Sequence, residues 1–222
     1  MNAWHLFWMI PLAISVGLCV PVLYVAAEDP VSYWHSRSVE AICRGASLTR
    51  SALPQPIELF DARGRPLHRI VRSVAERAAD FGAIILDSQQ ALLGSNEQQG
   101  IRDRDTSFWA AIDALERPTF LIAHPNRSDA RSWEKADGRI AGSEVNRDRT
   151  RMAWRMTWHD EPAVLGTSYR RYILENTKSS HGPKESNITF AASWTFGRDD
   201  DPGVLTFARA EDMKPEEELS EA

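Results

Sequence analysis

Hydrophobic positions form one long uninterrupted run near the N-terminus and shorter periodic segments after it. Residues 6–27, LFWMIPLAISVGLCVPVLYVAA, contain no charged side chain. At about 1.5 Å of rise per helical residue, such a run is just long enough to cross a hydrocarbon core of about 30 Å. The pattern therefore predicts a transmembrane anchor within residues 1–27, and no second run like it follows.

The same run has a second interpretation as a cleaved signal peptide, because Val25-Ala26-Ala27 resembles a cleavage site. The preceding segment MNAWH has no Lys or Arg, and the apolar run is longer than usual, which favours a retained anchor. Orientation is also open. Arg37 and Arg44 after the run would keep the following chain in the cytoplasm by the positive-inside rule, whereas the cleavage-like sequence and the domain type inferred below favour export.

A stalk helix is expected over residues 28–52. Pro30 suits the first turn of a helix, Val31 and Trp34 begin a loose apolar stripe, and Pro54 and Pro56 end the segment.

The following residues alternate between short apolar runs and polar turns. Residues 67–79 show the i, i+3, i+4, i+7 spacing of an amphipathic helix, and Gly82 is placed to stop it. A strand and turn are expected over 57–65, before this helix. After it we expect a hairpin, with strands over 84–86 and 91–93 joined by the turn 87–90. A helix capped by Asp105 or Thr106 and a strand over 120–122 are expected next.

The C-terminal third alternates with period two, which predicts antiparallel strands. Residues 126–150 are polar and are expected to be a long loop, and the acidic tail 211–222 is expected to be disordered. The strands are expected over 152–158, 164–173, 188–196 and 204–208, with a turn at His159-Asp160-Glu161-Pro162. The order of elements predicts one α+β domain over 53–210 with a central antiparallel sheet.

The composition excludes some classes of function but does not identify one. A net charge of −5 over 222 residues gives no reason to expect nucleic acid binding. The basic residues are mostly Arg, which is typical of a bacterial source. Two cysteines, Cys19 in the run and Cys43 in the stalk, exclude a disulfide framework and a cysteine-based zinc site.

Catalytic motifs are not found in the sequence. It has no HExxH, no nucleophile elbow, no phosphate loop and no GxGxxG. The neighbours His159, Asp160 and Glu161 could serve a metal or acid–base chemistry, but a solvated turn is the simpler interpretation. We therefore assign no catalytic residue, no metal ligand and no cofactor.

Two segments and the order of elements over residues 31–210 resemble the Cache-type sensor domains of bacterial membranes, which are related to the PAS fold. GAIILDSQQALLGSN looks like the first hairpin of such a domain, and RDRDTSFWAAI is similar to its lead into an aromatic helix. The resemblance implies a small-molecule pocket lined by Arg104, Trp109, Trp154 and Tyr169. Alternatively, the two tryptophans are core and Arg104 is solvated.

The combined expectation is a single-pass protein of the bacterial inner membrane, held by residues 6–27, with a periplasmic PAS/Cache-like domain. The domain would take part in signal transduction by binding a small molecule or a partner protein. A membrane protein partner would carry the response, because the sequence shows no second anchor and no output domain. The alternative is a structural or assembly subunit of a membrane complex, in which the Trp-rich sheet is an interface.

Overall fold

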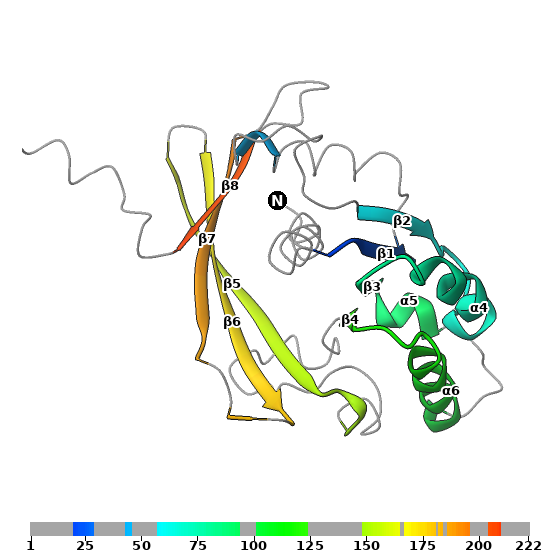
Figure 1. Ribbon diagram of the computed structural model, residues 1–222. Coiled ribbons are helices and arrows are strands. Elements are labelled where there is room, and N and C mark those ends of the chain that lie inside the picture. The colour runs from blue at the N-terminus through cyan, green and yellow to red at the C-terminus, as the bar shows by residue number, and fades with distance from the viewer. Residues whose placement is uncertain are drawn as a thin grey trace, which may run out of the picture. The chain divides into compact units, whose positions relative to one another are not determined.

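The chain divides into two compact units (Figure 1). The first comprises Met1–Ser36 and Ser51–Thr150, and the second comprises Arg37–Arg50 and Arg151–Ala222. The sequence had led us to expect one domain over 53–210. The mixture of helix and strand is confirmed. The computed structural model describes residues 20–28, 43–45, 57–93, 101–123, 148–164, 167–180, 182–183, 186–195 and 204–209.

The first unit is built on a four-stranded parallel sheet in the order β2-β1-β3-β4. In its register Ala26 lies level with both Asp61 and Asp87. Strands covered on both faces of a parallel sheet are apolar without interruption, and this holds for the two inner strands as far as Asp87. The strands are β1 (Val22–Ala26), β2 (Ile57–Asp61), β3 (Ala83–Asp87) and β4 (Thr119–Ile122).

Strand β1 corrects the sequence-based interpretation of the N-terminal run. Val22–Ala26, expected at the end of a membrane helix, is instead an inner strand whose residues are at most 4% exposed. The helix prediction is therefore wrong over these residues, and most of the run lies outside the described part of the chain. Within the described part, no helix combines the length and the apolar character needed to cross a membrane.

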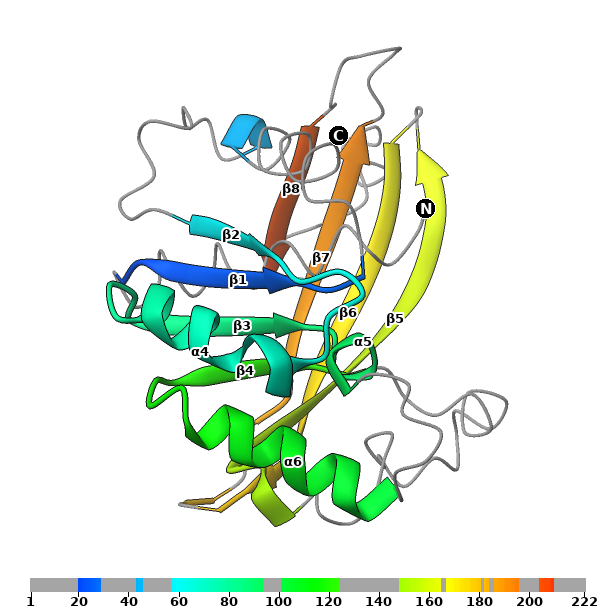
Figure 2. The same ribbon diagram turned by 90° about the vertical axis from the view of Figure 1, so that its right-hand side faces the viewer.

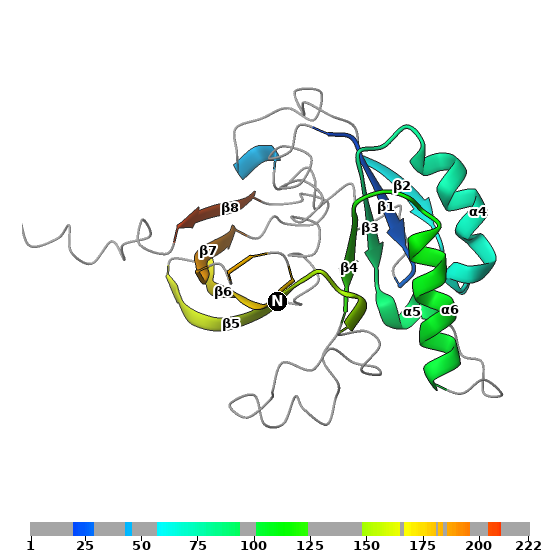
Figure 3. The ribbon, with the colours of Figure 1, turned by 60° about the horizontal axis from the view of Figure 1, so that its bottom comes forward.

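Three helices cover one face of this sheet: α4 (Leu67–Ala78), α5 (Gln89–Leu93) and α6 (Ile101–Asp113) (Figure 3). The predicted stripe of α4 is confirmed, because Leu67, Ile70, Val74 and Ala78 are its buried residues. They share a core with alternate residues of the strands, namely Leu23, Val25, Ile84 and Leu86. The intervening residues Val22, Tyr24, Ala26, Ala83 and Ile85 form a second buried cluster on the opposite face.

The predicted hairpin over 84–93 is wrong in its second half. Residues 84–86 belong to β3 as expected, but 91–93 belong to α5, and the neighbours of β3 are the parallel strands β1 and β4. A three-residue apolar run has no measurable period, so it cannot separate helix from strand. Helix α6 starts at Ile101, and Asp105 is buried within it where a cap was expected. The strand predicted at 120–122 is confirmed as β4.

Gly82 has a different role from the predicted helix stop. Helix α4 ends at Ala78, and the Gly82 N–H donates a hydrogen bond to the Pro21 carbonyl at 2.9 Å. A Cβ on Gly82 would lie 2.6 Å from the Cβ of Val20. The glycine therefore permits the chain before β1 to approach the chain before β3.

Replacing Gly82 with Ala is expected to lower the free energy of unfolding by about 1–3 kcal/mol, the usual cost of overpacking a filled interior. Urea denaturation of the two proteins measures this difference. Gly182→Ala is the matched control, because no atom of the described residues beyond its own chain neighbours lies within 4 Å of the place that its new Cβ would occupy. If both substitutions lowered the free energy of unfolding equally, the close contact with Val20 would not explain the loss of stability.

The second unit is a four-stranded antiparallel sheet in the order β5-β6-β7-β8, which confirms the antiparallel prediction for this region. The turn predicted at His159–Pro162 is wrong, since these residues continue β5 and His159 pairs with Arg171. Pro162 is tolerated because β5 is an edge strand with an irregular register between Glu161 and Val164. The strands are β5 (Met152–Val164), β6 (Thr167–Ser179), β7 (Ile188–Thr195) and β8 (Val204–Arg209).

Aromatic contacts link the last three strands of this sheet. The rings of Tyr172 and Phe190 stack with centroids 5.2 Å apart, and Phe190 meets Phe207 edge to face at 6.5 Å. Of the predicted stalk over 28–52, the structure describes residue 28 and a helical turn at 43–45, where Cys43 is buried and not in a disulfide. The tail 211–222 and most of the loop 126–150 lie outside the described residues.

Candidate functional site

The parallel sheet has a point at which its connections reverse direction. From β1 the chain moves to β2 on one side, and it then returns past β1 to β3 and continues outward to β4. The carboxyl ends of these strands lie at one edge of the sheet (Figure 2). In open sheets of this type, ligands bind outside the carboxyl ends at the reversal, which here falls between β1 and β3.

Polar side chains from both strands meet at this reversal. The Ala27 N–H donates to the Asp87 carbonyl at 2.7 Å, so the residues after β1 and β3 stay side by side. Beyond them the Ser88 hydroxyl donates to the Glu28 carboxylate. The Tyr24 hydroxyl of β1 donates to the Asp87 carboxylate. We call Glu28, Asp87 and Ser88 the carboxyl-edge site.

The carboxyl-edge site holds two carboxylates and one hydroxyl in a partly enclosed position. Ser88 is completely buried, whereas Glu28 and Asp87 are half-buried. Mg²⁺ is usually held by one or two carboxylates plus water and substrate phosphates, and seldom by a cage made of protein alone. Among the described residues, no group of three or more His, Cys, Asp or Glu side chains could form such a cage. The carboxyl-edge site thus offers oxygen donors of the kind that hard cations take.

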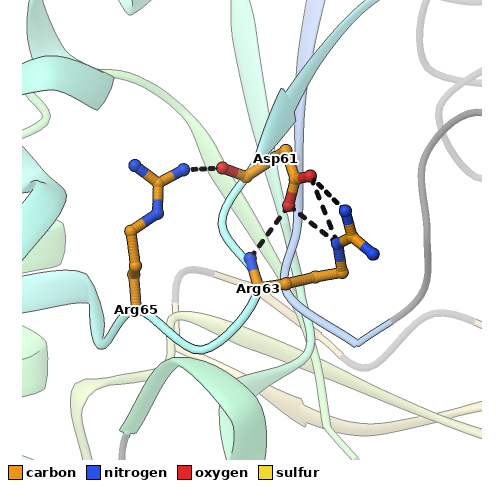
Figure 4. A network of polar contacts seen from close by, with 3 residues as sticks. All are labelled: Asp61, Arg63 and Arg65. Carbon is orange, nitrogen blue, oxygen red and sulfur yellow. Dashed lines mark hydrogen bonds and ion pairs between the residues drawn. The ribbon is translucent and has the colours of Figure 1, made fainter.

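The neighbouring strand end carries a compact ionic turn, shown in Figure 4. The Asp61 carboxylate accepts hydrogen bonds from the Arg63 backbone N–H at 3.1 Å and from the Arg63 guanidinium at 2.6–3.2 Å. The Arg65 guanidinium donates to the Asp61 carbonyl and lies 5.4 Å from the centre of the Phe60 ring. Gly64 occupies the left-handed region at φ 68°, which lets the turn close.

The charges of this turn have two consequences. The hydrogen bonds from Arg63 lower the pKa of Asp61 to about 2, so the carboxylate stays ionised at neutral pH. The turn contains one carboxylate, Asp61, and two guanidiniums, Arg63 and Arg65, so its net charge is positive. In the sheet register Asp61 lies level with Ala26, and Ala26 lies level with Asp87. The turn therefore begins two strand spacings from the end of β3, a distance of about 10 Å.

Asp61→Asn is expected to destabilise the protein at neutral pH by at most about 1 kcal/mol, because Asp61 and Arg63 are 46% and 45% exposed and water screens the pair. The folded-state pKa of Asp61 is depressed, so its contribution is present above pH 4 and is lost as pH falls from about 4 to about 2. Urea denaturation of both proteins at neutral pH and near pH 2.5 measures the change. A difference that grows on acidification would contradict the assignment.

The four residues of the predicted pocket fall into both units. Arg104 and Trp109 lie on α6, where Trp109 is 8% exposed and contributes to the helix-side core of the first unit. Trp154 lies on β5, level with Asn176, and Tyr169 lies on β6. The structure thus assigns a core position to Trp109, while the shared pocket stays a prediction.

The carboxyl-edge site was not predicted from the sequence. The signal was present, because each of two uninterrupted apolar runs ends in an acidic residue: VLYVAA before Glu28 and AIIL before Asp87. This pattern is typical of buried parallel strands that end at a site. It was missed because the first run was assigned to a membrane helix and the second to a hairpin.

Comparison of the sequence with protein-family models and with curated proteins found no match.

Proposed function

We propose that the first unit binds a divalent cation together with the phosphate groups of a nucleotide-sized small molecule. The observation that carries this proposal is the pair of contacts at the reversal of the sheet, Ser88 after β3 with Glu28 after β1 and Tyr24 of β1 with Asp87 of β3. Carboxylates at this position repel a free anion, so a phosphate ligand binds there through the cation.

The surroundings of the site support a ligand of this size and charge. Asp87 would hold the cation with its carboxylate oriented by the Tyr24 hydroxyl, and Glu28 would bind the cation or one of its waters. The positive turn of Arg63 and Arg65 lies about two strand spacings away, roughly 10 Å, which is within reach of the far end of a di- or triphosphate. Guanidiniums are well suited to contact phosphate oxygens.

Thermal unfolding of the full chain tests the proposal with Mg²⁺, ATP, ADP and pyrophosphate, each alone and in combination. A ligand at about 100 times its Kd adds about 2.7 kcal/mol to the free energy of unfolding. We therefore expect Mg²⁺ with ATP to raise Tm by several degrees, and EDTA to remove the shift. Equal Tm values with and without Mg²⁺ for all three phosphate ligands would contradict the proposal.

An exported Cache-type sensor domain is a second candidate. The antiparallel sheet of the second unit supports it, because such domains end in antiparallel strands. A sensor of this kind would be stabilised by an amino acid or organic acid without any cation, and Trp154→Ala would weaken that effect. Stable co-purification with membrane proteins, with no response to small molecules, would instead favour the subunit of a membrane complex.

A further inference from the structure

Strand β2 forms one edge of the parallel sheet, because β1 is its only neighbour among the described strands (Figure 2). The Ala62 N–H, just beyond β2, donates to the Ala26 carbonyl of β1. Backbone polar groups alternate between the two sides of a strand, so the N–H and C=O of Leu59 point away from β1. Among the described residues, no group pairs with them. The middle of β2 therefore offers an unpaired backbone edge to another chain.

A groove of about 760 Å³ lies beside this edge, between β2 and α4. It is lined by Leu59–Asp61 of the strand, by Arg65 of the following turn, and by residues on the α4 side as far as Asp80. Arg65 and Asp80 stand at opposite ends of α4, and its 12 residues make that helix about 18 Å long. An extended chain of about five or six residues covers the same length. The groove therefore suits an extended peptide that runs along the edge of the sheet.

The lining of the groove carries a net charge of −1, from three carboxylates and two guanidiniums. Ion pairs within the chain satisfy three of these five charges: Asp61 with Arg63, Glu76 with Arg72, and Arg77 with Glu58. The Arg65 guanidinium donates to the Asp61 carbonyl and faces the Phe60 ring. Asp80 is exposed, and no described side chain forms an ion pair or a hydrogen bond with it. A basic side chain of a partner would complement this charge.

We propose that β2 and the groove beside it bind an extended segment of a partner protein that carries a basic side chain. The segment adds a strand to the parallel sheet at its open edge. Its backbone pairs with the N–H and C=O of Leu59, its alternate side chains enter the groove, and a Lys or Arg side chain among them contacts Asp80. This role is separate from the cation–phosphate function, because it uses the outer edge of β2 and not the reversal between β1 and β3.

Fluorescence anisotropy of labelled synthetic peptides, titrated with the full chain, tests the proposal. The probe is an acetylated octapeptide in which lysine and valine alternate, and its control replaces each lysine with glutamate. We expect the lysine peptide to bind with a Kd below about 1 mM and the glutamate peptide to bind at least about tenfold more weakly.

Two methylated forms of the lysine peptide test the backbone pairing. One carries N-methyl groups on its lysines and the other carries them on its valines. Only one of the two sets of N–H groups can face β2, because the two sets point to opposite sides of an extended chain. One form should therefore lose at least about tenfold in affinity, whereas the other should stay within about twofold of the parent peptide.

Asp80→Lys tests the position of the site in the chain. Asp80 is exposed, so the variant should fold with an unchanged Tm. We expect it to bind the lysine peptide about fivefold more weakly than wild type and the glutamate peptide about fivefold more tightly, the upper range for an exposed ion pair. Asp103→Lys is the matched control, because Asp103 is exposed on α6, outside the groove, and the change in net charge is the same.

Several results would overturn the proposal. Equal weakening by Asp80→Lys and Asp103→Lys would mean that the peptide responds only to the overall charge of the protein. Equal affinities of the two methylated peptides would mean that no strand forms beside β2, and this comparison needs no protein variant. Absence of binding by the lysine peptide at about 1 mM would be equally decisive. A wild-type dimer that Asp80→Lys dissociates, measured by sedimentation velocity, would assign the groove to a second copy of this chain instead.

Discussion

Replacing Asp87 with Asn is expected to weaken the binding of Mn²⁺ by about 100-fold or more, which corresponds to about 2.7 kcal/mol. The Asp87 carboxylate supplies a full negative charge at the end of β3, and an amide oxygen supplies only a dipole. The side-chain oxygen of Asn can still accept the hydrogen bond from Tyr24, so the strand end should keep its shape. Titration of the free Mn²⁺ resonance measures the affinity of both proteins.

The stability of the same variant gives an independent check. The Asn oxygen can still accept the hydrogen bond from Tyr24, so Tm without a cation present should stay close to that of wild type. Asp103→Asn is the control, because Asp103 is exposed on α6 and its replacement removes the same formal charge. Similar losses of Mn²⁺ affinity in the two variants would point to bulk electrostatics and not to a site.

The second large effect concerns the fold. Leu23→Ala should lower the free energy of unfolding by about 2–5 kcal/mol, the usual range for a large-to-small change in a filled core. Leu23 is 0% exposed in β1, between β2 and β3, and belongs to the core shared with α4, α5 and α6. Urea denaturation of the purified chain measures the difference.

Ile188→Ala is a matched control of similar volume change, because Ile188 is 51% exposed at the start of β7. Its cost should stay within about 0.5 kcal/mol. If residues 22–26 ended a membrane helix instead of forming a strand, Leu23→Ala would leave the unfolding of the remaining chain unchanged. A difference below about 0.5 kcal/mol between wild type and Leu23→Ala would therefore contradict the parallel sheet.

Elements with a one-sided pattern could be predicted from the sequence. Helix α4 has one buried stripe and a charged opposite face, so its 3.6-residue period is visible in the sequence. Strands β5, β7 and β8 belong to an antiparallel sheet, and their two-residue period is equally visible. In α4 one face meets the core and the other is charged, so the sequence pattern shows which face is buried.

The parallel sheet could not be predicted in the same way. A strand covered on both faces has no alternation, and VLYVA in β1 therefore has the same pattern as part of a membrane helix. The site was hidden for a related reason. Glu28 and Ser88 are separated by 60 positions in the chain, and they meet because β1 and β3 pair in parallel register. Local sequence patterns do not reveal such pairing.

The most direct test of the proposed function is a crystal structure of the full chain with Mn²⁺ and a non-hydrolysable ATP analogue, with anomalous scattering used to locate the metal. We expect one strong peak about 2 Å from the Asp87 carboxylate, with Glu28 in its first or second coordination sphere and a phosphate oxygen in the first. A phosphate chain directed toward Arg63 and Arg65 would complete the expected arrangement. Mn²⁺ and the analogue bound elsewhere, with Asp87 still contacting only protein, would contradict it.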